Sequence, residues 1–272
     1  MSVINTNINA LTAQASIART DQQMGVAMNQ LSTGLRINSA KDDAAGLAIS
    51  TRMTAQINGL NQAVRNAQDG MSMLQTADGA YTEVTNMLQR MRELSVQAAN
   101  DTLGTTDRTN LQTEYSALST QIDAIGTNTT WNGKSILSTD AGDFNIQTGA
   151  ASSDTTSVTV NAFSTTVGTA VASGDLSSAT NAQSTMDNID TAMDSINSER
   201  ASLGAAVNSL QYTVNSLTNT STNMSASRSR IEDTDFSQAT AELSRTQIIK
   251  QASTAMLAQA NQQPQSVLAL LK

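Results

Sequence analysis

Two clusters of carboxylates are the residues in this chain best able to do chemistry. Glu232, Asp233 and Asp235 lie within four positions of one another, and Asp42 and Asp43 follow Lys41. Neighbouring carboxylates can exchange protons with a substrate or bind a cation. Neither cluster has the spacing of an EF-hand or of a zinc site. The spacing therefore favours charges at structural joints over an active site or a metal site.

The residue types that are absent from the chain limit the reactions and ligands that it can support. The chain contains no His and no Cys. It therefore lacks the usual ligands of zinc and haem, the commonest general base and the most reactive nucleophile. There is also no Gly-rich phosphate-binding loop. We expect a protein that is not an enzyme and that binds no cofactor and no metal.

Composition and charge exclude two further classes of partner. The net charge is -8 and no basic stripe is present, which disfavours nucleic acid because phosphate contacts need Lys and Arg. No segment approaches the roughly 20 apolar residues that a membrane-spanning helix needs, so we expect no membrane insertion. The first residues have neither the basic start nor the apolar run of a cleavable signal peptide.

Apolar residues recur with the 3/4 spacing of a coiled-coil seam over most of the chain. Aromatic residues make up only 3% of the chain, so a compact core is harder to build than narrow helical seams filled by smaller residues. The pattern predicts helices over about residues 3–35, 44–100, 107–125, 182–231 and 237–271. The first and last seams are thin and rich in Ala, so alone they should be weakly helical at best.

The two central seams are long and contain polar interruptions. The seam of 44–100 breaks at Asp78, and the seam of 182–231 includes Arg200, Ser221 and Arg228. At 1.5 Å per residue the first of these helices would be roughly 85 Å long, which predicts an elongated molecule. The N- and C-terminal halves must lie side by side for either seam to be buried.

In the middle of the chain the helical pattern gives way to strand-like and loop-like segments. Asn132-Gly133 is a hairpin turn signal, and 144–147 and 158–160 alternate like short strands. The Ser/Thr/Gly-rich stretch 164–181 reads as a surface loop. The predicted fold class is mainly α: an elongated antiparallel helical rod or coiled coil with a small β-hairpin insertion, its N- and C-terminal halves packed side by side.

Several ungapped blocks resemble bacterial flagellins. They are Ile4–Asn7, Gln30–Ile49 and Leu88–Leu94 in the first half, and Ser227–Asp233, Ala258–Gln262 and Val267–Leu271 in the second. The resemblance covers about residues 1–140 and 182–272. It implies a short flagellin that lacks the outer variable domains, because 140–181 leaves space only for a hairpin and a loop.

The resemblance implies a structural subunit that self-assembles into the flagellar filament. Residues 1–41 with 232–272 would form a terminal filament-core coiled-coil domain, and 42–231 a helical rod domain with a β-rich insertion at about 129–181. The implied partners are other copies of the chain, the flagellar export apparatus, an export chaperone, and the filament cap and hook-associated proteins. The implied location is the extracellular filament, reached without a cleaved signal peptide.

The resemblance also assigns roles to residues. Filament-core packing falls to Val3, Ile17, Leu31, Ile249, Met256 and Leu270. The linker between the two domains is Lys41, Asp42, Asp43, Glu232 and Asp233. Subunit contact in the filament, and recognition of the free subunit by host Toll-like receptor five, fall to Gln89, Arg90, Glu93, Leu94 and Glu114. Contacts of the tail with the chaperone and with intracellular immune sensors fall to Leu268, Leu270 and Leu271.

Two other kinds of protein remain open at this point. A hook–filament junction adaptor shares the flagellin ends but does not polymerise indefinitely; the blocks at 30–49 and 258–271 fit flagellin better. A coiled-coil surface adhesin or a secretion-needle tip protein would leave the matched blocks unexplained.

Overall fold

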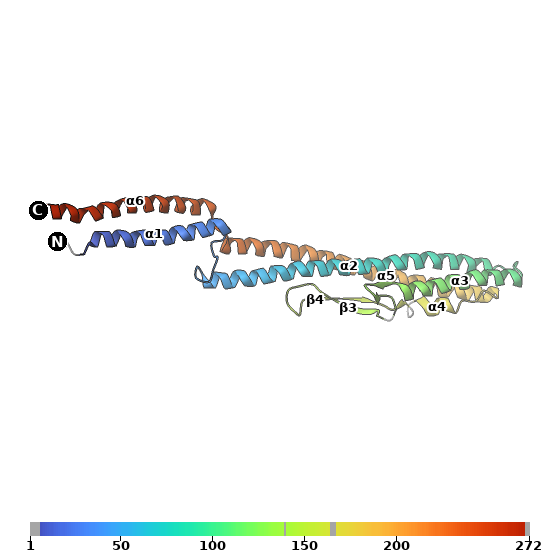
Figure 1. The fold of residues 1–272 in the computed structure, drawn as a ribbon. Helices are drawn as coiled ribbons and strands as arrows, with labels where there is room; N and C mark the ends of the chain where they lie inside the picture. The colour runs from blue at the N-terminus through green and yellow to red at the C-terminus, as the bar shows by residue number, and fades with distance from the viewer. Residues whose placement is uncertain (1–5, 139, 164–166, 270–272) are drawn as a thin grey trace. The chain divides into compact units, whose positions relative to one another are not determined.

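The computed structural model describes residues 6–138, 140–163 and 167–269 (Figure 1). The helices are α1 (Ile8–Thr33), α2 (Ala44–Ala98), α3 (Thr105–Asn128), α4 (Thr169–Ala172), α5 (Ala179–Glu232) and α6 (Phe236–Ala269). The strands are β1 (Thr130–Trp131), β2 (Lys134–Ser135), β3 (Gly142–Gln147) and β4 (Thr155–Val160). The predicted fold class, mainly α with a small hairpin and with its two halves side by side, is confirmed.

The chain divides into two compact units. The terminal unit comprises Met1–Ile57 and Thr222–Lys272, and the central unit comprises Asn58–Ser221. Both borders fall inside helices, one within α2 and one within α5. The helical run itself is interrupted at residues 34–43 and 233–235. The predicted domain borders lie at these interruptions and stay a prediction.

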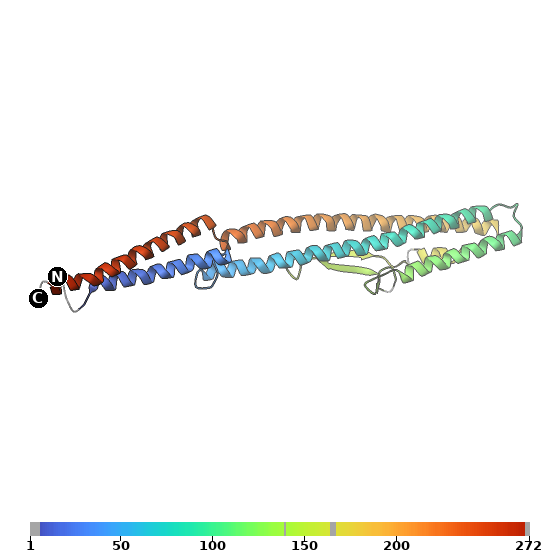
Figure 2. The same ribbon diagram turned by 45° about the horizontal axis from the view of Figure 1, so that its top comes forward.

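In the terminal unit, α1 and α6 lie side by side, as both views show (Figures 1 and 2). The Asn7 side chain caps α1 by accepting from Ala10 N at 3.0 Å, and its amide donates to Ala260 O of α6 at 2.7 Å. Gly34 ends α1 in the left-handed conformation, with φ of 73°, which glycine adopts at little cost. The capping residues thus set where the thin-seamed helix begins and ends.

The central unit buries most of the large apolar residues that make up the core. Leu74, Tyr81 and Leu88 of α2 are fully buried, as are Tyr115 and Ile122 of α3. The matching residues of α5 are Ile189, Ile196, Leu203 and Leu210. Apolar surface removed from water contributes about 25 cal/mol per Å², so this core is the main source of the unit's stability.

The β-rich insertion packs against α2. Asn132 and Gly133 have φ of 49° and 80°, the two positive values that a type I′ hairpin turn requires, so the predicted turn is confirmed. In the second hairpin, β3 and β4 are antiparallel and Phe144 lies opposite Val158. The Asn66 amide of α2 donates to Gln147 O at 3.1 Å, which ties this hairpin to the helix.

The prediction of a surface loop at 164–181 is wrong for the described residues 167–181. Val167, Val171 and Leu176 are fully buried in the core of the central unit. The segment is held to α3 because Tyr115 Oη donates to Val171 O at 3.1 Å and Leu176 N donates to Gln112 Oε1 at 2.7 Å. Burial of these three apolar residues outweighs the Ser/Thr/Gly composition that surrounds them.

Candidate interaction surfaces

The most buried positions of the seam between α1 and α6 are occupied by small residues. Ala27 and Thr20 of α1 are 2% and 5% exposed, and Ala239 and Thr246 of α6 are 5% and 0% exposed. Short side chains let the two backbones approach closely, and Cα atoms of the two helices come within 8 Å of each other. Such a seam buries little apolar area, so it contributes little stability by itself.

The residues predicted for filament-core packing occupy two different places. Ile17 and Leu31 are half-buried along the α1 side of the seam. Ile249 and Met256 lie beside the seam on α6 and are 38% and 67% exposed. The α6 seam runs instead through Ala239, Leu243, Thr246, Lys250, Ser253, Leu257 and Ala260. Val3 and Leu270 lie outside the described residues.

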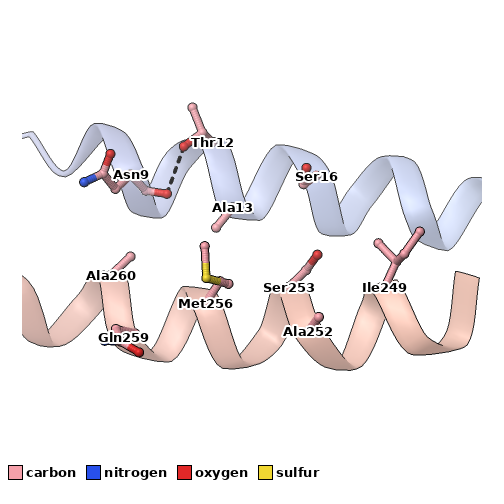
Figure 3. A pocket seen from close by; sticks show the side chains of 10 residues that line it. All are labelled: Asn9, Thr12, Ala13, Ser16, Ile249, Ala252, Ser253, Met256, Gln259 and Ala260. Atoms are coloured by element: carbon pink, nitrogen blue, oxygen red, sulfur yellow. Dashed lines mark hydrogen bonds between the residues drawn. The ribbon is translucent and has the colours of Figure 1, made fainter.

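An open groove of about 630 Å³ runs between α1 and α6 (Figure 3). Ala13 and Ser16 line it from α1, and Ile249, Ala252 and Met256 line it from α6. Figure 3 shows the Met256 and Ile249 side chains pointing toward α1, with Met256 near Ala13. The single subunit therefore leaves the apolar side chains of Ile249 and Met256 uncovered in a groove that polar residues such as Ser16 and Ser253 also line.

Exposed large apolar side chains gather in the terminal unit. Among the described residues, nine of the eleven such side chains belong to it: Ile8, Leu11, Val26, Met28, Ile49, Phe236, Ile248, Ile249 and Met256. Only Val96 and Tyr212 belong to the central unit. Contiguous exposed apolar surface on a soluble protein marks an interaction site. The terminal unit thus carries most of the exposed large apolar side chains among the described residues.

The first group of predicted linker residues caps the chain ahead of α2. Asp42 Oδ2 accepts from Ser39 N and from Ser39 Oγ, both at 3.0 Å. These hydrogen bonds, with one from Asn38 N, hold the pKa of Asp42 below its ordinary value. Asp43 Oδ1 accepts from Ala45 N and Gly46 N at the start of α2, while Lys41 is exposed.

The second group joins α5 to α6. Glu232 O accepts from Arg36 N at 2.6 Å, and Asp233 pairs with Leu35 in an isolated β-bridge. The Arg36 guanidinium also donates to the carbonyls of Arg230 and Ile231 at the end of α5. The structure thus brings the stretch after α1 together with the stretch after α5.

The carboxylates of these clusters are used in capping. Asp235 Oδ1 accepts from Ser237 N at 2.8 Å at the start of α6, and Asp233 Oδ2 accepts from Ser229 Oγ at 2.6 Å. Within the part of the chain that the structure describes, no group of three acidic side chains is placed to hold a metal ion. Their observed role is to fix helix ends.

The predicted recognition residues form an ion-pair cluster across α2 and α3. Arg90 Nη2 lies 2.8 Å from Glu114 Oε1, and Arg90 Nη1 lies 3.0 Å from Glu93 Oε2. Hydrogen bonding to Glu114, then to Glu93, raises the pKa of Arg90. These three side chains and Gln89 are exposed, whereas Leu94 is 1% exposed and faces the core. The cluster therefore presents charged groups to the solvent, whereas the Leu94 side chain packs in the hydrophobic core of the central unit.

The predicted tail contacts fall at the edge of the described chain. Leu268 belongs to α6, but its side chain lies outside the described part. Leu270 and Leu271 lie outside the described residues altogether.

Sequence reasoning did not pair the polar residues that join α2 to α5 in the central unit. Arg200 Nε lies 2.8 Å from Asp78 Oδ1, and Arg92 Nε lies 2.7 Å from Asp190 Oδ1. The hydrogen bond from Arg92 lowers the pKa of Asp190. The pairing of Arg200 with Asp78 could have been predicted from the polar interruptions of the two seams. A polar residue at a seam position needs a polar partner.

Comparison with known proteins gives a consistent result. The family model described as "Bacterial flagellin N-terminal helical region" matches residues 4–141, and that described as "Bacterial flagellin C-terminal helical region" matches residues 186–271. The chain is 46% identical to a flagellin of Halalkalibacterium halodurans over 275 residues, covering 99% of this chain and 100% of that protein. It is 41% identical to a flagellin of Xenorhabdus nematophila, covering 100% of this chain and 99% of that protein.

A solved structure extends the similarity to the fold. The crystal structure of Bacillus cereus flagellin has a TM-score of 0.52 and 38% sequence identity, covering 60% of this chain and 94% of that chain. The described helices of the present chain include none with the length and hydropathy to cross a membrane.

Proposed function

The chain belongs to the bacterial flagellin family, the structural subunits of flagellar filaments, and we propose that it self-assembles into such a filament through its terminal unit. The observation that carries this proposal is the concentration of exposed large apolar side chains on α1 and α6 and at the start of α2. The central unit, by contrast, encloses most of its large apolar residues, with Val96 and Tyr212 exposed.

The thin seam explains why a neighbouring copy is needed. The α1–α6 contact is closed by Ala and Thr, while Ile249 and Met256 stand in an open groove. A second copy that covers this groove removes apolar surface from water, and that burial offsets the entropy of ordering the two helices. Folding of the terminal unit is thereby coupled to association.

The contact must be heterologous to give a filament. A contact between two different surface patches that does not close into a ring propagates as a helix. Residues 1–41 and 232–272 would form the inner shell of that helix and 42–231 the next shell. With only the β1–β4 insertion between the halves, the filament would carry no outer domains and present a smoother surface.

Electron microscopy of the purified chain with sheared filament seeds tests the proposal. The full chain should form long filaments, and a version without residues 1–41 should form none. A finer test replaces Ile249 with Asn in the groove and, as a matched control, the exposed Gln251 with Asn on the same helix. We expect I249N to stop elongation and Q251N to leave it unchanged.

The same experiment decides between filament subunit and junction adaptor. Monomers or short stubs from the full chain, even with seeds, would exclude unaided polymerisation. The junction adaptor would then be the better assignment.

If the chain is a filament subunit, its location and its further partners follow. We place the assembled subunit outside the cell, in the flagellum. Export would require the flagellar export apparatus and a chaperone that contacts the tail at Leu268, Leu270 and Leu271. The filament cap and hook-associated proteins would be its neighbours at the two ends of the filament. Pull-down of the chaperone by the full chain, but not by one ending at residue 266, tests the tail contact.

The ion-pair cluster on α2 and α3 supports a second role, recognition of the free subunit by Toll-like receptor five. Gln89, Arg90, Glu93 and Glu114 present polar groups outward on the central unit. Replacing Arg90, Leu94 and Glu114 with Ala should abolish receptor-reporter activation. Full activation by the triple variant would show that the receptor does not recognise these residues.

Controls separate recognition from folding in that experiment. Arg92→Ala removes an exposed arginine that pairs with Asp190 instead, and it should leave activation unchanged. Because Leu94 is buried, circular dichroism of the triple variant must match the unsubstituted chain. The double variant R90A/E114A tests the exposed groups alone.

A further inference from the structure

Methionine exposure divides unevenly along the chain. The sequence has 12 Met, and among those that the structure describes only Met28 and Met256 have more than half of their surface exposed, at 55% and 67%. Met73 and Met91, in the core of the central unit, are 7% and 0% exposed. Oxidation of a thioether requires access to the sulfur, so Met28 and Met256 are the described methionines most open to it.

Met256 differs from Met28 in its surroundings. Its side chain lies in the α1–α6 groove and points toward Ala13 of α1, with Ser253 between it and Ile249 along α6 (Figure 3). Met28 is not among the residues that line this groove. A flexible, polarizable thioether is well suited to fill an irregular gap against a partner surface.

We propose that Met256 is a redox-modification site, at which oxidation of the free subunit to the sulfoxide by a peroxide or a hypohalous acid blocks its incorporation into the filament. This inference rests on the proposed function. With hydrogen peroxide, the O–O bond breaks and one oxygen forms a bond to the Met256 sulfur. The sulfur loses two electrons, the peroxide is reduced, and water leaves.

The physical effect follows from polarity. A sulfoxide oxygen is a hydrogen-bond acceptor, and burying it without a donor is costly. A neighbouring copy that covers the groove would remove water from that oxygen, in a lining where Ile249, Ala252 and Ala13 are apolar and Ser16 and Ser253 carry hydroxyls. The cost arises because a site shaped around a thioether does not place donors where the new oxygen lies. The same closure would shield the unmodified sulfur, so the reaction belongs to the free subunit and not to the assembled one.

The test compares seeded elongation before and after peroxide treatment, with peptide mapping by mass spectrometry. Met256 and Met28 should be oxidised ahead of Met73 and Met91, and elongation should fall by about tenfold, the effect of one unsatisfied buried polar group. Treatment with both epimer-specific methionine sulfoxide reductases should restore the rate. In filaments assembled first, Met256 should resist oxidation.

Two volume-conserving variants show which methionine is responsible, each compared with its own untreated elongation rate. Met256→Leu should lose the peroxide-dependent fall, whereas Met28→Leu should keep it. Subunits carrying the Met256 sulfoxide that elongate at the untreated rate would overturn the inference and leave the proposed function intact. Untreated subunits that never elongate would overturn both. The reductase experiment uses the unsubstituted chain, so it tests whether sulfoxide formation slows elongation even if a variant does not fold.

Discussion

Arg200 Nε lies 2.8 Å from Asp78 Oδ1, and the two side chains are 35% and 45% exposed. Both occupy seam positions of their helices, where their neighbours are apolar. A polar pair at such a position costs stability relative to a packed apolar pair, but it disfavours shifted pairings that would leave one charge alone. We therefore expect the pair to specify the register of α2 against α5.

A double-mutant cycle on Arg200→Ala and Asp78→Ala measures this pair. Each single change should lower the free energy of unfolding by about 1 kcal/mol, with a coupling of about 0.5 kcal/mol, because the pair is partly exposed. The charge-swapped double variant D78R/R200D should recover much of the loss. Additive single changes in urea unfolding would show that the pair is not coupled.

Gly126→Ala should destabilise the central unit. A Cβ at this buried position of α3 would overlap the ring of Phe163, so we expect a loss of about 1–3 kcal/mol from overpacking. Gly79→Ala is the matched control, because nothing lies within 4 Å of its Cβ position in α2. That change should stabilise by about 0.5–1 kcal/mol through helix propensity. Thermal unfolding that ranks the two variants in the opposite order would contradict the packing.

Tyr115 should make unfolding sensitive to alkaline pH. Burial raises the pKa of Tyr115 to about 12, above its ordinary value of 10.0. A raised pKa in the folded state means that stability is fully present below pH 10 and is lost as pH rises toward 12. Tyr115→Phe should reduce this loss, measured as the free energy of unfolding between pH 9 and pH 12.

The same substitution has a cost at neutral pH. Tyr115→Phe removes the 3.1 Å hydrogen bond from Tyr115 Oη to Val171 O, and a loss of about 1 kcal/mol is expected. Val171 O keeps a second donor in Gly174 N at 3.3 Å, which limits the loss. Unchanged stability at pH 7 would mean that water replaces the hydroxyl.

Ala27→Leu should separate α1 from α6. Ala27 is 2% exposed where the two backbones approach closely, so the added side chain has no space and should cost about 1–3 kcal/mol. Ala15→Leu, at an exposed position of the same helix, is the control. Hydrogen exchange of the α6 amides should rise in the first variant only. Equal exchange in both variants would count against the small-residue seam.

The sequence by itself determined the helices and the main turn. The 3/4 spacing and the absence of internal Pro over 44–100 and 182–231 predicted α2 and α5, and Asn132-Gly133 predicted the hairpin turn. These features are local: apolar periodicity and the tolerance of Asn and Gly for positive φ act within a few residues. The flagellin resemblance likewise depended on contiguous blocks of residues.

Only the tertiary structure decided which face of α6 meets α1 and which residues join α2 to α5. The large residues Ile249 and Met256 suggested the inner face of α6, yet the most buried positions of α6 are Ala239 and Thr246, because small side chains there permit the close approach of the two backbones. The pairing of Asp78 with Arg200 joins positions 122 residues apart, and no local pattern specifies such a partner. Contacts of this kind depend on how the helices pack in space, which the periodicity of each helix does not contain.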